Sequence, residues 1–477
     1  YVYKDKFTII CPVISKIYPL NGFYGQNITI EGENFNIGEN VINVSFYNIN
    51  NLYYAVALAE ISSVSDNKII IKVPDGIDSI PKKIKVQVAG SETFSGEIFV
   101  LDPPEITGIT PSELVPDSII TISGKNFNPS DLSTQVFLGK HSIHVVSATT
   151  TQIVASLPTS MTRGNYRISI KTAGYKRTYN SVYEVKSKWR EIDLPDNFQW
   201  YSSAETGGSG LSFSTTDAAY IMDYYLGFLT LCNPASGEFI NMGRYPEFTG
   251  TAMQKGIVNR DTLYIMKGSV GISRFDPAGK SWISIIEPAF TELKYGVAFS
   301  INGKIYKGLD FSIYGHTFDN RFWVLDPVQK TWLPKKSLPG YSERLPVEYF
   351  VIGNKGYVLF DDKVFCEYDP YEDEWTLLSP FPGSGMSRAL MVSFVIDNKA
   401  YVGSGKDWFT YEGMEHEDFW TYDPQTGSWA QNTFMPWGPR SGSISFVVNN
   451  KAYVGFGLKS GISQKDLFEF DPYYPVK

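Results

Sequence analysis

Residues 418–429 read DFWTYDPQTGSW, and the centre of this stretch recurs through the second half of the chain. Each copy has an aromatic or apolar residue, Asp-Pro, a polar turn and a tryptophan, as in FDPAGKSW (275–282), LDPVQKTW (325–332) and YDPYEDEW (368–375). A degenerate copy is CNPASGEF (232–239), and a truncated one is FDPYY (470–474). The Asp or Asn positions are 233, 276, 326, 369, 423 and 471, at intervals of 43, 50, 43, 54 and 48 residues. Repeats of about 40–50 residues with four short strands each indicate a propeller.

A second element precedes each copy and reads INGKIY, IGNKGY, IDNKAY or VNNKAY in the clearest cases. Asn-Gly, Gly-Asn and Asp-Asn between alternating strands favour two-residue hairpins, since these residues tolerate positive φ. In this order, the two elements resemble the kelch repeat over about residues 187–477. The first repeat lacks both the Asp and the Trp, and the usual Gly-Gly after the second strand is reduced to Gly-x-Gly or lost.

The two ends of this region complement each other. The last copy stops before a fourth strand, whereas SKWREIDLP (187–195) looks like a fourth strand without its first three. We therefore expect residues 187–193 to close the last blade, with Trp189 equivalent to Trp282, Trp332, Trp375 and Trp429. This gives six blades and removes an open sheet edge.

The first part of the chain is a tandem repeat. Residues 12–36 align with residues 104–128 at an offset of 92, which pairs Gly32 with Gly124 and Asn34-Phe35 with Asn126-Phe127. Its apolar residues alternate, as in strands with one buried face. The I-x-x-I-x-P motif, the Ile-Thr-Ile-x-Gly run and the Asn-Phe pair resemble the IPT/TIG family of immunoglobulin-like domains, which implies spacers in bacterial surface proteins.

The expected fold is therefore all-β, with two tandem immunoglobulin-like β-sandwiches and a six-bladed kelch-like β-propeller. We expect a linker or the tail of an upstream domain at 1–11, sandwiches at 12–102 and 103–186, and the propeller at 187–477.

Composition narrows the classes of function. The formal charge is −8 with no basic block, which argues against nucleic acid as a partner. Three cysteines make no disulfide framework, and no apolar run reaches the roughly 18 residues of a transmembrane segment. The chain begins at Tyr1, so we expect that any targeting segment lies outside it. No motif requires a metal or another cofactor, and we predict none.

The variable distances lie between the second and third strands of each repeat, so binding residues are expected on those loops and on the blade connections. Arg344, Arg388 and Arg440 each stand 11 residues before a hairpin lysine and could grip a carboxylate or hydroxyls together. The structural alternative is that they bind loop carbonyls. The aromatic candidates, whose faces stack on sugars or pack on the next blade, are Trp200, Tyr314, Trp408, Tyr411 and Trp437.

These features favour a non-catalytic binding protein of the bacterial cell surface or periplasm. We expect a monomer that binds carbohydrate through the loop-rich face of the propeller, with the sandwiches as spacers. Its partner would be a glycan or another surface protein. The alternatives are a protein-interaction scaffold and a sugar epimerase or mutarotase like the six-bladed kelch sialic-acid mutarotases. No catalytic residue is assigned.

Overall fold

The computed structural model confirms the all-β fold class. It describes residues 11–474 except for 36–41, 130–133, 201–209, 217, 224–225, 247–254, 268–270, 286–294, 313–316, 327–330, 341–343, 386, 408–412 and 433–434. Strands and turns make up this part of the chain, which contains no helix. The chain divides into two compact units, residues 1–186 and 187–477.

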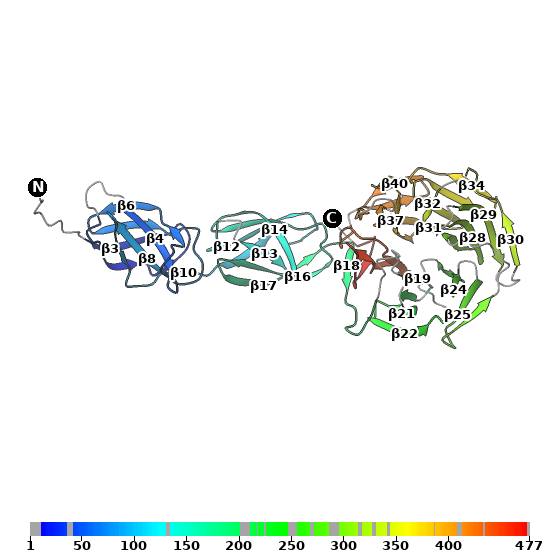
Figure 1. Ribbon diagram of the computed structural model, residues 1–477, viewed down its shortest axis with the longest axis horizontal. Coiled ribbons are helices and arrows are strands. Elements are labelled where there is room, and N and C mark those ends of the chain that lie inside the picture. The colour runs from blue at the N-terminus through cyan, green and yellow to red at the C-terminus, as the bar shows by residue number, and fades with distance from the viewer. Residues whose placement is uncertain are drawn as a thin grey trace, which may run out of the picture. The chain divides into compact units, whose positions relative to one another are not determined.

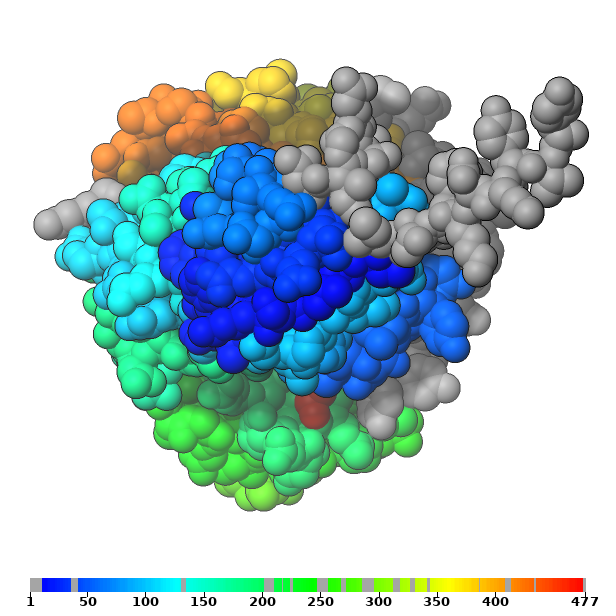
Figure 2. All heavy atoms as spheres, turned by 90° about the vertical axis from the view of Figure 1, so that its left-hand side faces the viewer, coloured from blue at the N-terminus to red at the C-terminus, as the bar shows by residue number. Residues whose placement is uncertain are grey.

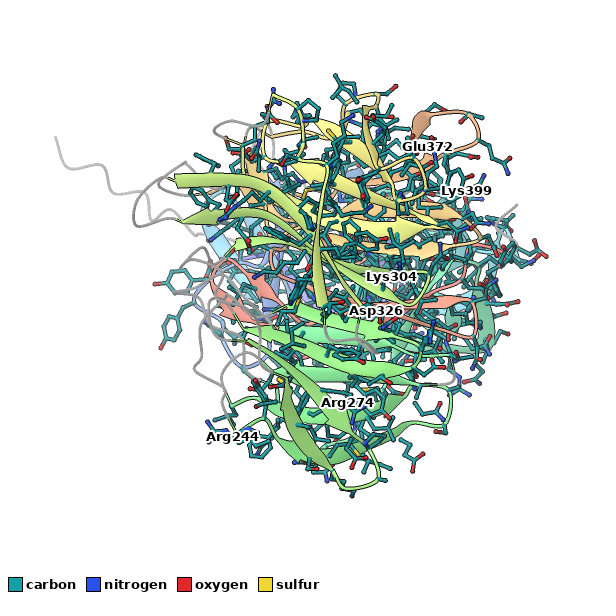
Figure 3. All side chains as sticks on the ribbon, turned by 90° about the vertical axis from the view of Figure 1, so that its right-hand side faces the viewer. Arg244, Arg274, Lys304, Asp326, Glu372 and Lys399 are labelled. Atoms are coloured by element: carbon teal, nitrogen blue, oxygen red, sulfur yellow. The ribbon has the colours of Figure 1, made fainter. Side chains whose placement is uncertain are left out.

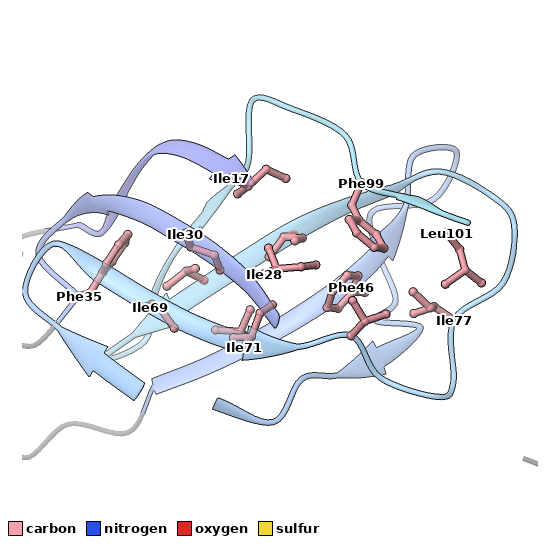
Figure 4. Close-up of a cluster of buried hydrophobic side chains, with 14 of the residues drawn as sticks. Ile17, Ile28, Ile30, Phe35, Phe46, Ile69, Ile71, Ile77, Phe99 and Leu101 are labelled. Carbon is pink, nitrogen blue, oxygen red and sulfur yellow. The ribbon is translucent and has the colours of Figure 1, made fainter. Parts of the chain in front are cut away.

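The first sandwich has two four-stranded sheets and a core of alternating strand residues. One sheet has the order β1 (Val13–Tyr18), β3 (Asn27–Glu33), β7 (Lys68–Lys72) and β6 (Ile61–Ser65). The other has the order β5 (Ala57–Leu58), β4 (Ile42–Asn48), β8 (Lys82–Val88) and β9 (Ser91–Phe94). The short strands β2 (Asn21–Gly22) and β10 (Val100–Leu101) pair in parallel. Figure 4 shows the core between the sheets, and Figure 2 looks onto this sandwich, whose early strands are dark blue.

The second sandwich repeats this plan with its sheets joined through one strand. Strand β14 (His141–Ala148) pairs with β13 (Gln135–Leu138) on one side and with β15 (Gln152–Ser156) on the other. Its register with β15 shifts between Val145 and Ser147. The strand order is β11 (Glu105–Thr110), β12 (Ile119–Lys125), β15 (Gln152–Ser156), β14, β13 (Gln135–Leu138), β16 (Gly164–Thr172) and β17 (Tyr175–Val185).

The repeated Gly and Asn-Phe residues of the two sandwiches have the same structural roles. A Cβ on Gly32 would collide with the Val13 carbonyl and the Phe35 ring, and one on Gly124 would collide in the same way with Glu105 and Phe127. The asparagine before each phenylalanine has positive φ, and its side chain donates to a carbonyl 23 residues earlier, at 3.2 Å in the first copy and 3.0 Å in the second. The motif therefore ties the end of β3 to the segment before β1, and the end of β12 to the segment before β11.

The second unit is a propeller of six four-stranded antiparallel sheets around a ring (Figure 1). The first blade consists of β19 (Gly210–Ser214), β20 (Ala219–Asp223), β21 (Phe228–Asn233) and β22 (Glu238–Arg244). The second consists of β23 (Lys255–Asn259), β24 (Thr262–Lys267), β25 (Gly271–Asp276) and β26 (Ser281–Ile285). The third consists of β27 (Tyr295–Ile301), β28 (Lys304–Ser312), β29 (Thr317–Asp326) and β30 (Thr331–Lys335). The fourth blade consists of β31 (Pro346–Ile352), β32 (Lys355–Phe360), β33 (Phe365–Asp369) and β34 (Glu374–Leu377). The fifth consists of β36 (Val392–Ile396), β37 (Lys399–Gly403), β39 (Phe419–Asp423) and β40 (Ser428–Gln431).

The sixth blade joins the beginning of this unit to its end. Its order is β41 (Ile444–Val448), β42 (Lys451–Gly455), β45 (Leu467–Phe470) and β18 (Trp189–Ile192), so the outermost strand comes from the start of the propeller. Residues within the expected segment 187–193 thus form the closing strand. Arg190 adds an ion pair with Glu469 at 2.6 Å.

In the fourth and fifth blades, the Asp-Pro phrase makes the turn between the last two strands and ties that turn to the hairpin lysine. The carboxylate of Asp423 accepts the N–H of Gln425 within the turn and pairs with the hairpin lysine Lys399 at 2.8 Å. The tryptophan then reaches out of its blade, since Trp429 Nε1 donates to the Ser379 carbonyl of the preceding connection at 3.2 Å. Equivalent contacts recur in the fourth blade through Asp369, Lys355 and Trp375, and the sixth keeps the Lys451–Asp471 pair.

Candidate functional site

Two kinds of turn divide the propeller into two faces. The hairpins and Asp-Pro turns are short, and in Figure 3 Lys304, Lys399 and Glu372 from such turns lie toward one side of the ring. Both central residues of the hairpins at 302–303, 397–398 and 449–450 have positive φ, as tight two-residue turns require. Arg244, at the end of β22, lies toward the other side. The second-to-third-strand loops and the blade connections lie on that face, here called the loop face.

A pocket of about 360 Å³ opens beside the first blade. Its walls come from the connection between β18 and β19, the β20–β21 loop, and the strands β21 and β22. The lining residues are Pro195, Asn197, Phe198, Gln199, Trp200, Asp223, Leu226, Phe228, Thr230, Phe239 and Asn241. This volume lies in the range of small-molecule sites, which combine apolar walls with a few polar groups.

The aromatic wall of the pocket is fixed by packing between the sixth and first blades. Trp200 stacks on Phe456 with ring centroids 4.2 Å apart, and Phe198 packs edge-on against Phe239 at 5.3 Å. Both Trp200 and Phe198 are buried although they line the pocket. Phe228 differs because 38% of its surface is exposed, so its ring is free to receive an apolar face.

In the part of the chain that the structure describes, the polar side chains of the pocket are three exposed amides, the Thr230 hydroxyl and one buried carboxylate. Among the described residues, the side chains of Asn197 and Gln199 make no hydrogen bond, which leaves their donors and acceptors to water or a ligand. Asp223 instead holds the loop, because its two oxygens accept the N–H groups of Leu226 and Phe228 at 2.6 and 3.2 Å. The carboxylate thus orients Phe228.

Two of the three arginines proposed from the sequence are buried and paired. Arg388 is 3% exposed, lies 2.6 Å from Asp418 and donates to the Ser404 carbonyl at 2.7 Å. Arg440 is 1% exposed and makes a bidentate pair with Asp466, at 2.5 and 2.7 Å. Binding to loop carbonyls was the structural alternative, and these contacts match it.

The third arginine, Arg344, lies partly exposed and pairs with Asp362 at 2.7 Å. The expectation that the three arginines present free guanidinium groups to one shared depression is therefore wrong. Each of them already holds an aspartate, because the loop between the second and third strands supplies an acidic partner.

Electrostatics of the buried Arg388–Asp418 pair agree with a structural role. Burial opposes ionisation of Asp418, but the attraction of Arg388 and the hydrogen bonds from Trp420 and Ser384 outweigh it and hold the pKa of the carboxyl below its usual range. Burial in turn lowers the pKa of Arg388, against the opposing charge of Asp418. Each charge in this pair is needed to keep the other in the protein interior.

Two of the remaining predicted site residues, Trp200 and Trp437, lie in the described part of the chain. Trp200 lines the pocket, whereas Trp437 is buried against Trp189, with ring centroids 5.2 Å apart. Tyr314, Trp408 and Tyr411 lie outside the described residues. Sequence reasoning missed Phe228 and the two amides, although Asn197 and Gln199 fall in the unusually long entry to the first blade. That length was the signal that could have found them.

Neither a metal centre nor a membrane-spanning helix is found among the residues that the structure describes. No group of three or more His, Cys, Asp or Glu side chains there is placed to hold a metal ion. No helix in this part of the chain is long and apolar enough to cross a membrane.

Comparison with known proteins matches the first unit to a domain family and shows partial similarity of the chain to a Kelch-like protein and an epimerase. Residues 12–99 and 104–185 match the IPT/TIG domain. The chain carries two IPT/TIG domains followed by a kelch-type propeller. It is 29% identical to mouse Kelch-like protein 35 over 153 residues, which is 31% of this chain and 24% of that protein. It is 33% identical to N-acetylneuraminate epimerase of Escherichia coli O157:H7 over 140 residues, which is 28% of this chain and 35% of the enzyme.

These matches are partial. The chain spans about a quarter of the mouse protein and about a third of the epimerase. Among solved structures, an auxiliary nutrient binding protein from Bacteroides thetaiotaomicron superposes with a TM-score of 0.47 and 10% identity over 78% of this chain and 98% of that one. A score at this level supports no argument about function.

Proposed function

We propose that the propeller of this IPT/TIG and kelch-type chain binds carbohydrate in the pocket of its first blade. The observation that supports this most is the combination of an exposed ring, Phe228, with the unpaired amides of Asn197 and Gln199 around about 360 Å³. Aromatic faces stack on the C–H faces of sugars, and amides donate to and accept from hydroxyl groups. A sugar ring needs both kinds of contact.

Carbohydrate binding in this pocket requires no catalytic acid or base. Of the residues that the structure describes around the pocket, Asp223 alone carries a carboxylate, and that side chain is engaged by the backbone of its own loop. The two IPT/TIG domains would then act as spacers at a bacterial cell surface or in the periplasm, with the chain as a monomer. Protease protection on intact cells and light scattering in solution test these two statements.

The experiment for the binding proposal is a glycan array probed with the whole chain and with Phe228→Ala. We expect the wild-type chain to bind at least one class of oligosaccharide and the variant to lose most of that signal. A wild-type chain that binds none of the glycans, in an array that includes neutral and acidic oligosaccharides, would contradict carbohydrate binding.

A sugar epimerase or mutarotase is the second candidate, because of the 33% identity with N-acetylneuraminate epimerase. Exchange between anomers of N-acetylneuraminate, followed by NMR with catalytic amounts of the chain, distinguishes it from binding alone. Exchange no faster than in buffer removes this candidate and leaves the binding proposal intact.

A further inference from the structure

A serine, a histidine and an aspartate outside the pocket form a continuous chain of hydrogen bonds. Ser384 Oγ lies 3.1 Å from Nδ1 of His416, and Nε2 of His416 lies 3.0 Å from Oδ1 of Asp407. Ser384 belongs to the connection between the fourth and fifth blades. Asp407 ends the short strand β38 (Lys406–Asp407), and His416 precedes β39. The fold therefore assembles the three side chains on the loop face from separate segments.

The chain of hydrogen bonds runs from solvent to the interior. Ser384 is exposed, whereas His416 is 5% and Asp407 8% exposed. A buried carboxylate that accepts a hydrogen bond from one imidazole N–H fixes the ring and its tautomer, and leaves the other nitrogen to accept a hydrogen bond from the serine. Here Nε2–H would donate to Asp407, and Nδ1 would receive the serine proton.

The backbone of the serine is clamped by the buried ion pair described above. Ser384 N donates to Oδ2 of Asp418 at 3.1 Å, and the Ser384 carbonyl accepts from Nη1 of Arg388 at 3.4 Å. Arg388 and Asp418 hold each other at 2.6 Å. Both polar backbone groups of the serine are thus fixed by the same pair, which orients its hydroxyl toward the histidine.

The following residue, Gly385, allows the backbone to pass directly over the histidine and the aspartate. Its φ is +87°, and a Cβ there would lie 2.5 Å from His416 Nε2 and would also collide with the Asp407 carboxylate. A side chain at this position would displace the pair. The Gly-Ser-Gly sequence at 383–385 is consequently matched to the site in both conformation and space.

We propose that Ser384, His416 and Asp407 form a nucleophilic site that hydrolyses carboxylic esters. Ser384 Oγ attacks the ester carbonyl while its proton moves to His416 Nδ1. The C–O bond to the alcohol breaks, and the alcohol leaves with that proton, which gives an acyl-serine. Water then attacks the acyl-serine and gives a proton to His416. The bond between the acyl carbon and Oγ breaks, His416 Nδ1 returns that proton to Oγ, and the carboxylic acid and free Ser384 are released. Asp407 is a positioning residue, and no oxidant or cofactor is needed. This proposal does not depend on the carbohydrate pocket.

The test uses the whole chain with p-nitrophenyl acetate as substrate and a fluorophosphonate as covalent label. We expect release of p-nitrophenol above the buffer rate by about 10²-fold. We also expect a single phosphonyl adduct, which mass spectrometry places on the peptide that contains Ser384. Ser384→Ala should lose both signals, whereas Ser379→Ala, an exposed serine of the same connection, should keep them. A folded wild-type chain with no adduct at Ser384 and no hydrolysis above buffer would overturn the proposal.

Asp407→Asn separates positioning from a purely structural contribution. When assayed below the melting temperature of the variant, this substitution should lower kcat by roughly 10²-fold or more relative to the wild type. KM should change little, since the substrate does not touch the aspartate. The adduct should still form at Ser384, only more slowly. An unchanged kcat in a variant that melts earlier would show that the aspartate only stabilises the loop and would remove it from the site.

Discussion

Trp189 lies directly opposite Phe470 across the β18–β45 pair, and their ring centroids are 4.7 Å apart. The two residues are separated by almost the whole propeller in sequence, so their contact is the closure of the ring. Trp189 is buried, and it also touches Phe419 of the fifth blade at 5.7 Å. The closing strand therefore stabilises two blades.

Removal of this contact should destabilise the propeller strongly. We expect Trp189→Ala to lower the free energy of unfolding by about 3–5 kcal/mol, as for loss of a large buried aromatic. A propeller that begins at residue 196 should melt earlier still, because β45 becomes an open edge. Leu377→Ala, an exposed position on the outer strand β34, is the control and should change little. Equal melting of the truncated and intact propellers would contradict closure by β18.

The buried arginine should behave as a structural group. Arg388→Ala leaves Asp418 buried without its partner, which should cost about 3–5 kcal/mol of unfolding free energy in a chemical denaturation. Arg344→Ala removes a partly exposed pair and should cost at most about 1 kcal/mol. If Arg388→Ala unfolds at the same denaturant concentration as the wild type, the Arg388–Asp418 pair contributes nothing to the stability of the fold.

Acid should weaken ring closure through Glu469. Burial raises the pKa of this carboxyl, but the hydrogen bonds and charges of Arg190 and Lys451 outweigh burial and hold the pKa below its ordinary 4.5. A carboxylate with a depressed folded pKa stabilises above its unfolded pKa, and this contribution is lost as pH falls through the folded pKa. The melting temperature should therefore decrease once the pH is lowered below about 4.5.

The variant Glu469→Gln tests this acid dependence. Its deficit in melting temperature relative to the wild type should be largest near neutral pH and should shrink as the pH falls below about 4.5. Glu372→Gln, in an exposed turn, should keep the wild-type profile. A deficit that stays constant down to pH 2 would show that the Glu469 charge is not involved.

The three cysteines are free and should differ in reactivity. Burial raises the pKa of the Cys366 thiol to about 11 and also raises the pKa of the buried Cys232, while Cys11 is exposed. Titration of the native chain with a disulfide reagent should count one fast thiol, and titration under denaturant should count all three. A native count of three would mean that the propeller opens around Cys232 and Cys366.

The sequence was sufficient for the fold because its signals are local and repeated. The positive φ of Asn302-Gly303 and the Asx-type contact of Asp423 depend on a few neighbouring residues, and each recurs in other blades. Even the closing strand followed from spacing, because Trp189 lacked a blade of its own. Repetition therefore revealed long-range pairing that a single segment would not.

The site was less predictable because it depends on contacts between blades. The equal offsets of Arg388 and Arg440 showed equivalent positions but not that Asp418 and Asp466 would bury and neutralise them. Phe228 becomes part of a pocket only when the connection from β18 crosses the first blade. The acidic partners lie in loops of variable length, where no periodicity indicates which side chains meet.

The measurement that tests the central proposal most directly is the affinity of the wild-type chain and of Phe228→Ala for a glycan identified on the array, by calorimetry. The proposal predicts that the variant binds more weakly by about 1–3 kcal/mol with an unchanged melting temperature. Tyr371→Ala removes a ring that is 91% exposed in an Asp-Pro turn on the opposite face, and this control should bind like the wild type. Equal affinities for the wild type and Phe228→Ala would contradict carbohydrate binding in this pocket.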